Sequence, residues 1–549
     1  TSTGNQATGF NGAFTFSSLN AYAITEQGLA NGLSIAAIRA LGGGPSQFSI
    51  ITGTPSASVT MYDLSPYVQD DWRLRPNLTV SGGLRLETQN HIADHADWAP
   101  RLGVAWGVGG AKPKFVLRAG WGIFYDRFPP NLVLQSERQN GFTEQEFVIA
   151  QPDFFCPNSL AACPSIGTLQ STSVPTIYRI SPNLRAPMLM QSAVSVERQL
   201  TKNANISISY LNSRGWHQLV TNNVNSPVLP GTLTPASPAR GGVYPNGIAE
   251  NIYQYQSAGV FRQNQLMFNT SIRAGARLSL NAFYSLNFAH SDTAGANSFS
   301  SDPYNLMADY GRAAFDIRSR VFFGGTVGLP YGLRLSPFLV ASSGAPYNVT
   351  LGQDLIGSSI FNQRPAFAGA LSNPANVVAT PLGAFDTVPQ PGETLVPVNF
   401  LTGPSQFSLN LRLAKTFSFG RLPEGSAGQV GARQNGGGGG GRRGPGGGAP
   451  PVGGGGFGGG FGGAPTAGRY SIVLSVNVRN IFNNVNLSTP IGNIGSPLFG
   501  ESTGLSNGGF GFGGGAQTSG AGATAGLPSA GGGAPAANRQ IFLQATFGF

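Results

Sequence analysis

Charged residues are scarce in this sequence. Asp, Glu, Lys and Arg make up 10% of the 549 residues, against roughly 25% in an ordinary soluble domain. Long apolar runs are also missing, because no stretch reaches the ~18 apolar residues that a membrane-spanning helix needs. The mean hydropathy is −0.02. These absences exclude a helical membrane protein and a highly charged disordered chain.

Clustered basic residues are missing as well, although basic residues exceed acidic ones by 33 to 23 and give a net charge of +10. The basic side chains are spread singly along the chain, and the one dense spot is Arg442-Arg443 inside a glycine tract. A nucleic-acid-binding surface needs a basic patch. We therefore expect no nucleic-acid partner.

The sequence starts at Thr1 without the charged, apolar and small-residue pattern of a signal peptide. We expect that such a segment has been removed or that the chain is a fragment. Cysteine is limited to Cys156 and Cys163. Two nearby cysteines in an exported chain favour a small disulfide loop. A metal site is the weaker alternative, because zinc usually takes four ligands and no further Cys or His lies close by.

The segment that closes the sequence has a clear alternation of apolar and polar residues. Side chains on a strand point to opposite faces in turn. The polar face would carry Gln540, Gln544, Thr546 and Gly548, and Phe542 is the exception. The apolar face would carry Ile541, Leu543, Ala545, Phe547 and Phe549. One oily face and one wet face are what the last strand of an outer-membrane barrel needs, although a soluble sandwich strand alternates too.

The same alternation recurs along the chain and predicts about fourteen to sixteen strands. Most of them are close to the ~9–11 residues with which a tilted strand crosses a bilayer. The clearest segments are 78–87, 101–108, 115–125, 278–288 and 470–478. Short turns are predicted at 73–77, 109–113, 200–203, 274–277 and 329–332. Long polar loops are predicted at 126–187, 213–263, 290–316, 343–403 and 482–538.

Alternating short turns and long loops are typical of outer-membrane barrels, whose long loops face outside. A closed barrel also satisfies every backbone polar group in lipid. We predict an all-β, antiparallel transmembrane β-barrel in the outer membrane of a Gram-negative type of cell, with membrane lipid as a partner. Counted back from the last strand, 420–468 lies on the periplasmic side. Its glycine density predicts a disordered insertion, and 507–537 is a second Gly/Ala/Ser-rich stretch.

No constellation predicts an enzyme. His91, Asp94, His95 and Asp97 could hold a metal, but solvated loop residues are the favoured interpretation. The adjacent Asp70 and Asp71 precede Trp72 and are expected at the membrane interface. The glycine-rich stretch 107–112 lacks the spacing and the following helix of a phosphate loop. We expect no catalytic, metal or cofactor-binding residues.

Several motifs resemble the barrel of TonB-dependent receptors. They are Tyr67-Val-Gln-Asp-Asp-Trp-Arg73, the stretch 78–85, Ala99-Pro-Arg-Leu-Gly-Val104 and the stretch 117–127. The stretches 315–320, 343–347 and 480–484 resemble the Oar-like branch of that family. The resemblance implies a 22-stranded barrel that follows an N-terminal extension, a TonB box and a plug, none of which is visible here. Residues 58–549 would be the C-terminal part of the barrel, and residues 1–57 would be N-terminal barrel strands or a loop.

The resemblance also implies partners and a function. Phe547 and Phe549 would form the signal that the barrel-assembly machinery reads. A TonB-type energy-coupling protein would act through the missing N-terminal region, and an unknown extracellular substrate would be taken up. The first hypothesis is therefore an energised outer-membrane transporter. The alternatives are an Oar-like structural or adhesion protein without transport, and a self-contained porin in which residues 1–60 pair with the last strand.

Overall fold

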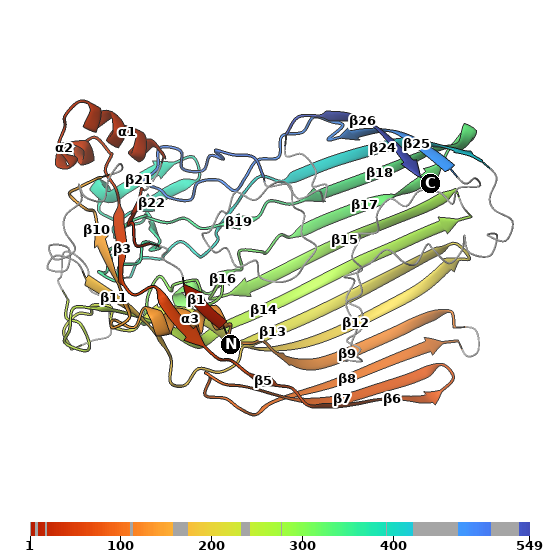
Figure 1. Ribbon diagram of the computed structural model, residues 1–549, viewed down its shortest axis with the longest axis horizontal. Coiled ribbons are helices and arrows are strands. Elements are labelled where there is room, and N and C mark those ends of the chain that lie inside the picture. Colours follow the sequence, from red (N-terminus) through yellow and green to blue (C-terminus); the bar gives the residue numbers. More distant parts are fainter. Residues whose placement is uncertain are drawn as a thin grey trace.

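The central unit of the computed structural model is a meander of thirteen antiparallel strands (Figure 1). The structure describes residues 2–5, 9–16, 19–109, 113–156, 174–231, 242–275, 277–390, 392–420, 470–506 and 537–548. The strands of the meander, in order of pairing, are β6 (Tyr67–Arg75), β7 (Leu78–Gln89), β8 (Asp97–Val108), β9 (Phe115–Tyr125), β12 (Met188–Thr201), β13 (Ala204–Asn223), β14 (Asn251–Ala274), β15 (Leu278–Ser291), β17 (Ser319–Gly328), β18 (Leu333–Ser342), β24 (Gln406–Phe419), β25 (Tyr470–Arg479) and β26 (Gln540–Gly548).

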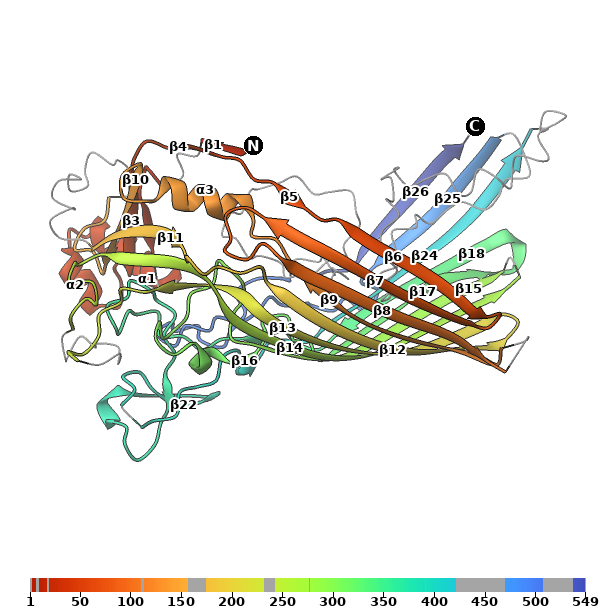
Figure 2. The ribbon, with the colours of Figure 1, turned by 90° about the horizontal axis from the view of Figure 1, so that it is seen from below.

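Short turns gather at one end of this meander, which we call the turn end. Four of the five predicted turns are confirmed: β6 and β7 are separated by residues 76–77, β12 and β13 by 202–203, β14 and β15 by 275–277, and β17 and β18 by 329–332. Residues 110–112 of the fifth, 109–113, lie outside the described residues. The long connections lie at the opposite end, the loop end, except for 420–469, which joins β24 to β25 at the turn end. In Figure 2 the chain's C-terminus lies at the turn end, and α1, α2, β3 and β10 lie at the loop end.

The sheet curls but does not close within the described residues. No ladder joins β6 to β26, whose neighbours in the meander are β7 and β25. The meander contains thirteen strands, so the predicted number of fourteen to sixteen is slightly high for the described part of the chain. β13 and β14 are also far longer than predicted, with 20 and 24 residues. They extend into the predicted loop 213–263 and reduce it to residues 224–250.

In the described residues, the predicted loops 126–187, 290–316 and 343–403 contain short helices and strands. The segment before the meander contains β1 (Ser2–Asn5), β2 (Ala13–Thr15), α1 (Leu19–Ala30), α2 (Ile35–Ala40), β3 (Gln47–Gly53), β4 (Ser56–Val59) and β5 (Asp63–Leu64). The connection 126–187 contains α3 (Pro130–Arg138), β10 (Glu144–Ala150) and β11 (Val174–Ile180). The remaining connections contain β16 (Gly311–Arg312), β19 (Pro346–Tyr347), β20 (Ala366–Phe367), β21 (Val377–Thr380), β22 (Gly383–Asp386) and β23 (Leu401–Thr402), with 3-10 turns at Leu306–Asp309, Pro330–Gly332 and Pro374–Asn376.

These elements make the fold mostly β rather than wholly β. No helix in the described ranges is long and apolar enough to cross a membrane. The strands β2, β3, β10 and β11 extend the main sheet at the loop end, because β3 pairs with β10, β10 with β11, and β11 runs parallel to β14. The segment 1–57 thus lies beside the loop end, and in the described residues none of it pairs with β26.

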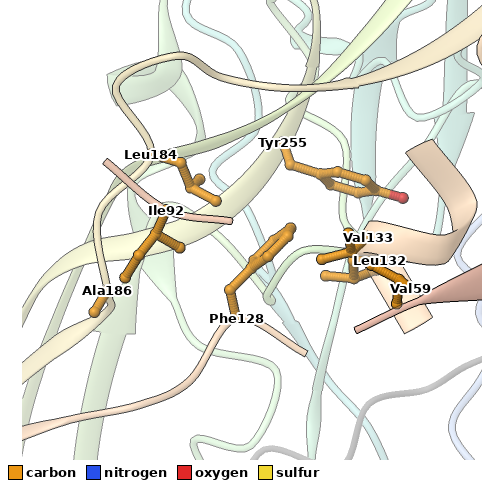
Figure 3. Packing of buried hydrophobic residues seen from close by; sticks show 8 residues of the cluster. All are labelled: Val59, Ile92, Phe128, Leu132, Val133, Leu184, Ala186 and Tyr255. Atoms are coloured by element: carbon orange, nitrogen blue, oxygen red, sulfur yellow. The ribbon is translucent and has the colours of Figure 1, made fainter. Parts of the chain in front are cut away.

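The largest apolar core lies at the loop end and fixes α3 on the rim of the sheet. α3 begins with Pro130 at its first turn, where the missing N–H costs no hydrogen bond. Its Leu132 and Val133 are buried against Phe128 and Tyr255, whose ring centroids lie 5.9 Å apart. Figure 3 shows these side chains directed toward one another from α3, from β14 and from the segment 126–129 that precedes α3. The meander itself has little apolar core, since one of its faces is polar.

Candidate functional site

The two faces of the meander differ in chemistry. One face carries the exposed apolar side chains, for example Leu102, Tyr210 and Leu543, which are 59%, 46% and 83% exposed. The other face carries mainly Ser, Asn, Gln, Thr and Gly, together with an apolar group on β15, β17 and β18 that includes Phe283, Phe322, Phe338 and Val340. Residues of this polar face such as Ser213 and Ser408 are fully buried, so the sheet curls with its polar face inside. We call this face the inner wall. An apolar outside and a polar inside are the arrangement of a transmembrane barrel.

Rows of directly paired residues define the inner wall. One row contains Gln191 of β12, Ser213 of β13, Gln263 of β14 and Ala289 of β15. Gln263 donates a hydrogen bond to Asn287 over 2.7 Å. Nearer the turn end, a polar recess lies on β13, β14 and β15 and is lined by Asn205, Ser207, Asn269, Thr270, Ser271, Asn281 and Ala282. Uncharged hydrogen-bonding groups therefore line the middle of the wall.

Charge is distributed unevenly over the inner wall. The strands from β6 to β12 place four arginines and four acidic residues on it, and two of the pairs are close: Arg85 to Glu87 at 3.7 Å and Arg118 to Glu197 at 3.9 Å. The eight strands from β13 to β26 contain no Asp or Glu at all. Their register places five arginines on the inner wall: Arg273, Arg320, Arg334, Arg412 and Arg479.

Arg320 lies near the middle of the half of the inner wall that runs from β13 to β26 and contains no acidic residue on its strands. It lies opposite Ser285 on one side and Ser342 on the other. No acidic residue lies within ion-pair distance of Arg320 in the described part of the chain. Arg412 lies opposite Ser336 and Asn477. Because the serines opposite Arg320 carry no charge, the wall around Arg320 keeps a positive potential toward the lumen.

Tyrosines and one acidic residue continue the inner wall at the loop end. Tyr178 of β11 stands next to Tyr253 and Tyr255 of β14, with ring centroids 5.3 Å and 5.9 Å away. Glu146 of β10 shares this face, since its partner Thr176 lies two residues before Tyr178. Burial raises the pKa of Glu146 to about 7. Burial also raises the pKa of Tyr178 well above its usual value, and the charge of Glu146 adds to this rise.

The two histidines considered for a metal contact separate carbonyls, whereas Asp94 and Asp97 lie within hydrogen-bond distance of each other. His91 contacts the Thr60 carbonyl through Nε2, and His95 contacts the Gln89 carbonyl through Nδ1. Asp94 lies 3.9 Å from Arg185. The prediction that Asp97 is a solvated loop residue is wrong, because Asp97 begins β8 and is only 4% exposed. Within the described ranges, no group of three or more His, Cys, Asp or Glu could hold a metal ion.

Other predicted features fall partly inside the described residues. Asp70 and Asp71 are adjacent on β6 and point to opposite faces, so they do not form a carboxylate pair. In the glycine-rich stretch 107–112, Gly107 is the second-last residue of β8. Residues 110–112 lie outside the described ranges. Cys156 carries no free thiol, but Cys163 lies outside the described residues and the Cys156–Cys163 disulfide stays a prediction. The tracts 421–469 and 507–536 and the terminal Phe549 also lie outside them.

Comparison with known proteins then decides the family. A profile of the outer membrane β-barrel domain family matches residues 1–97 and 92–423, which is most of the chain. The chain belongs to this outer membrane β-barrel family. Its localisation is the outer membrane, as the apolar outer face and the hairpin meander require. Proteins of the outer membrane β-barrel type are typically transporters and not enzymes. A search of curated proteins found no match.

Solved structures similar to this chain include a transporter and two receptors. The outer membrane transporter YddB from Escherichia coli matches with 12% identity and a TM-score of 0.44, over 82% of this chain and 44% of that one. The siderophore receptor PirA from Pseudomonas aeruginosa matches with 11% identity and a TM-score of 0.36, over 80% of this chain and 50% of that one. The ferric enterobactin receptor PfeA from Pseudomonas aeruginosa matches with 12% identity and a TM-score of 0.42, over 81% and 42%. The chain spans half or less of the length of these three structures.

Proposed function

We propose that this chain is the barrel portion of an outer-membrane uptake protein of the TonB-dependent type, and that its substrate is an anionic solute. The loop end faces outside and binds the solute, and the inner wall conducts it toward the turn end. A TonB-type energy-coupling protein supplies the energy through a part of the protein outside this sequence. The inner wall attracts the solute and performs no covalent chemistry.

The observation that carries the proposal is the charge of the inner wall. Five arginines and no acidic residue lie on the wall from β13 to β26. Two opposite unit charges 4 Å apart gain about 1 kcal/mol in water and about 4 kcal/mol near a protein surface. A water-filled lumen lies between these limits. Such a wall concentrates anions and repels cations of the same size.

The balanced half of the wall supports the same conclusion. From β6 to β12, four arginines lie among Asp71, Glu87, Asp97 and Glu197, so their charges offset one another in part. A solute with one anionic side and one neutral polar side would fit both halves. The neutral contacts would come from the serine- and asparagine-lined recess on β13, β14 and β15.

Comparative depletion of solutes tests this function without assuming the ligand. Cells with and without the complete gene are grown in one mixed medium, and the medium is assayed for solutes that disappear. We expect the gene to be needed for depletion of one or more anionic solutes, and a strain without the energy-coupling protein to lose the same depletion. Loss of a neutral or cationic solute alone would contradict the anionic substrate. Unchanged depletion in both strains would contradict uptake.

Adhesion is the second candidate, and one observation favours it. The loop end carries large exposed apolar side chains that no described residue covers, including Phe142 at 97% exposure and Leu19 at 72%. An adhesion protein would use such side chains to contact another surface. The depletion experiment separates the two functions, because a gene deletion that alters attachment of cells and leaves every solute unchanged favours adhesion.

A further inference from the structure

Two arginines lie directly opposite each other on the apolar, outward face of the sheet. Arg214 of β13 pairs with Arg262 of β14, and Arg262 pairs with His290 of β15. Both arginines are exposed. Like charges at directly paired positions destabilise a sheet. The pair therefore needs an anion that the neighbouring strands do not supply.

The acidic residues near this row already have partners. Asp292 is buried and accepts a hydrogen bond from the Val260 backbone N–H over 2.7 Å. Asp316 is fully buried and lies 3.0 Å from Arg312 and 3.1 Å from Arg318. The Arg318 guanidinium also lies 4.3 Å from the centre of the Phe288 ring, on the same outward surface. In the described part of the chain, no ion pair or hydrogen bond involves the side chains of Arg214 or Arg262. The row thus has more positive charge than its own acids can neutralise.

The position of the row along the strands identifies the environment. On the same face, Tyr210 lies on the turn-end side of Arg214 and Trp216 on the loop-end side, and they are 46% and 36% exposed. Tyr210 donates a hydrogen bond to Asn264 over 2.7 Å, and Asn212 donates to the same oxygen over 2.8 Å. Aromatic girdles flank the apolar band of such barrels at the level of the lipid headgroups. The arginine row therefore lies at the headgroup level nearest the loop end.

We infer that Arg214 and Arg262, with His290 beside them, bind the phosphate of a membrane lipid headgroup. Guanidinium groups bind phosphate through paired N–H donors, and a phosphate between the two arginines removes their repulsion. The occupant is a lipid that carries a phosphomonoester, anchored by its chains against Tyr210, Leu266 and Leu286 below the row. The site lies outside the lumen and is independent of the proposed uptake.

Native mass spectrometry of the full chain in neutral detergent tests this site. The probe is dimyristoyl phosphatidic acid, and phosphatidylcholine with the same chains is the neutral-headgroup comparison. We expect phosphatidic acid adducts on the wild type, and an affinity about fivefold or more lower in the double variant Arg214→Gln with Arg262→Gln. Each single variant should lose part of this affinity for phosphatidic acid. The single variants therefore still test the site if the double variant folds poorly.

The matched control is Arg198→Gln. Arg198 is an exposed outward arginine at the turn end of β12, opposite the apolar Ile206, and its variant should bind phosphatidic acid like the wild type. Equal loss in Arg198→Gln, or equal binding of phosphatidylcholine, would overturn the site. Displacement of the lipid by inorganic phosphate at equal concentration would show that free phosphate, and not a lipid, is recognised.

Discussion

The ring of Tyr470 stacks on the ring of Phe547, with centroids 6.1 Å apart and planes inclined by 15°. Phe419 completes the group, 5.8 Å from Tyr470 and 6.4 Å from Phe547. The three rings come from β24, β25 and β26 at the turn end. Aromatic pairs contribute about 0.5–1.5 kcal/mol beyond their buried area. They therefore hold the last strand in place, which the position of Phe547 in the sequence alone did not show.

Replacement of Phe547 should impair assembly of the barrel. Phe547→Ala removes both ring contacts, and we expect a lower folded fraction of the complete protein in outer-membrane fractions, read from heat-modifiable mobility. Phe549→Asp should act mainly on recognition by the assembly machinery, because a charge near the interface costs only about 0–1 kcal/mol. Phe482→Ala, at a loop-end side chain that is 67% exposed, is the control. Normal folding of both terminal variants would show that this strand is not an insertion signal.

Labelling of intact cells should follow the two ends of the meander. Phe142 at the loop end is 97% exposed and Tyr331 at a turn is 88% exposed. A membrane-impermeant thiol reagent should react with Phe142→Cys in intact cells and with Tyr331→Cys only after the outer membrane is opened. The reverse pattern would refute the proposal that the loop end faces outside.

The alternation of residues predicted much of this fold. The faces of β15 and β25 are confirmed, because apolar and polar residues there mostly follow a period of two, broken by Phe283 and Val473 on the polar face. The short turns 73–77, 200–203, 274–277 and 329–332 are confirmed as well. The sequence pattern does not predict β14 over 251–263, because Asn251, Gln254, Gln256 and Gln263 put polar side chains on both faces. Helix α3 was hidden inside a predicted loop because its apolar residues serve one local core.

The site depends on register, which the sequence does not reveal. Arg214 meets Arg262 only because register shifts between Gly215 and Val220 fall beyond this pair. The absence of acidic residues from the eight meander strands between β13 and β26 can be seen in the sequence. Its meaning appears only when the pairing places Arg320, Arg412 and Arg479 on one face. Phe542, the exception to the last alternation, lies on the inner wall, 5.1 Å from the Arg479 guanidinium.

The predicted disulfide should be present in mature protein. Cys156 and Cys163 should resist alkylation without reductant and react after reduction, as measured by mass. Loss of the bond through Cys156→Ser should loosen the connection 126–187 at the loop end and leave the meander folded, because none of its thirteen strands contains a cysteine. Two free thiols in protein isolated without reductant would refute the pairing.

Glu146 should make the loop-end sheet sensitive to pH. Burial raises its pKa from the usual 4.5 to about 7. Between these values the folded state holds a proton that the unfolded state has lost, so stability falls as pH rises through this window and is constant above it. The total loss is up to about 3 kcal/mol. Hydrogen exchange of β3 and β10 between pH 5 and pH 8 should show it. Glu146→Gln should remove the dependence, and an unchanged pH profile in this variant would contradict the assignment.

Binding of a polyanion to the inner wall tests the central proposal most directly. The purified full chain is titrated with a fluorescent pyrene trisulfonate, and with a cationic pyrene of similar size. We expect the anionic probe to bind the wild type more tightly than the cationic probe does. High salt should weaken binding of the anionic probe. Its affinity for the double variant Arg320→Gln with Arg412→Gln should be lower by about fivefold or more. Lys415→Gln, on the outward face of β24 opposite Leu333, should bind like the wild type. Equal affinity of the wild type and the double variant, or equal binding of the cationic probe, would contradict an anion-selective inner wall.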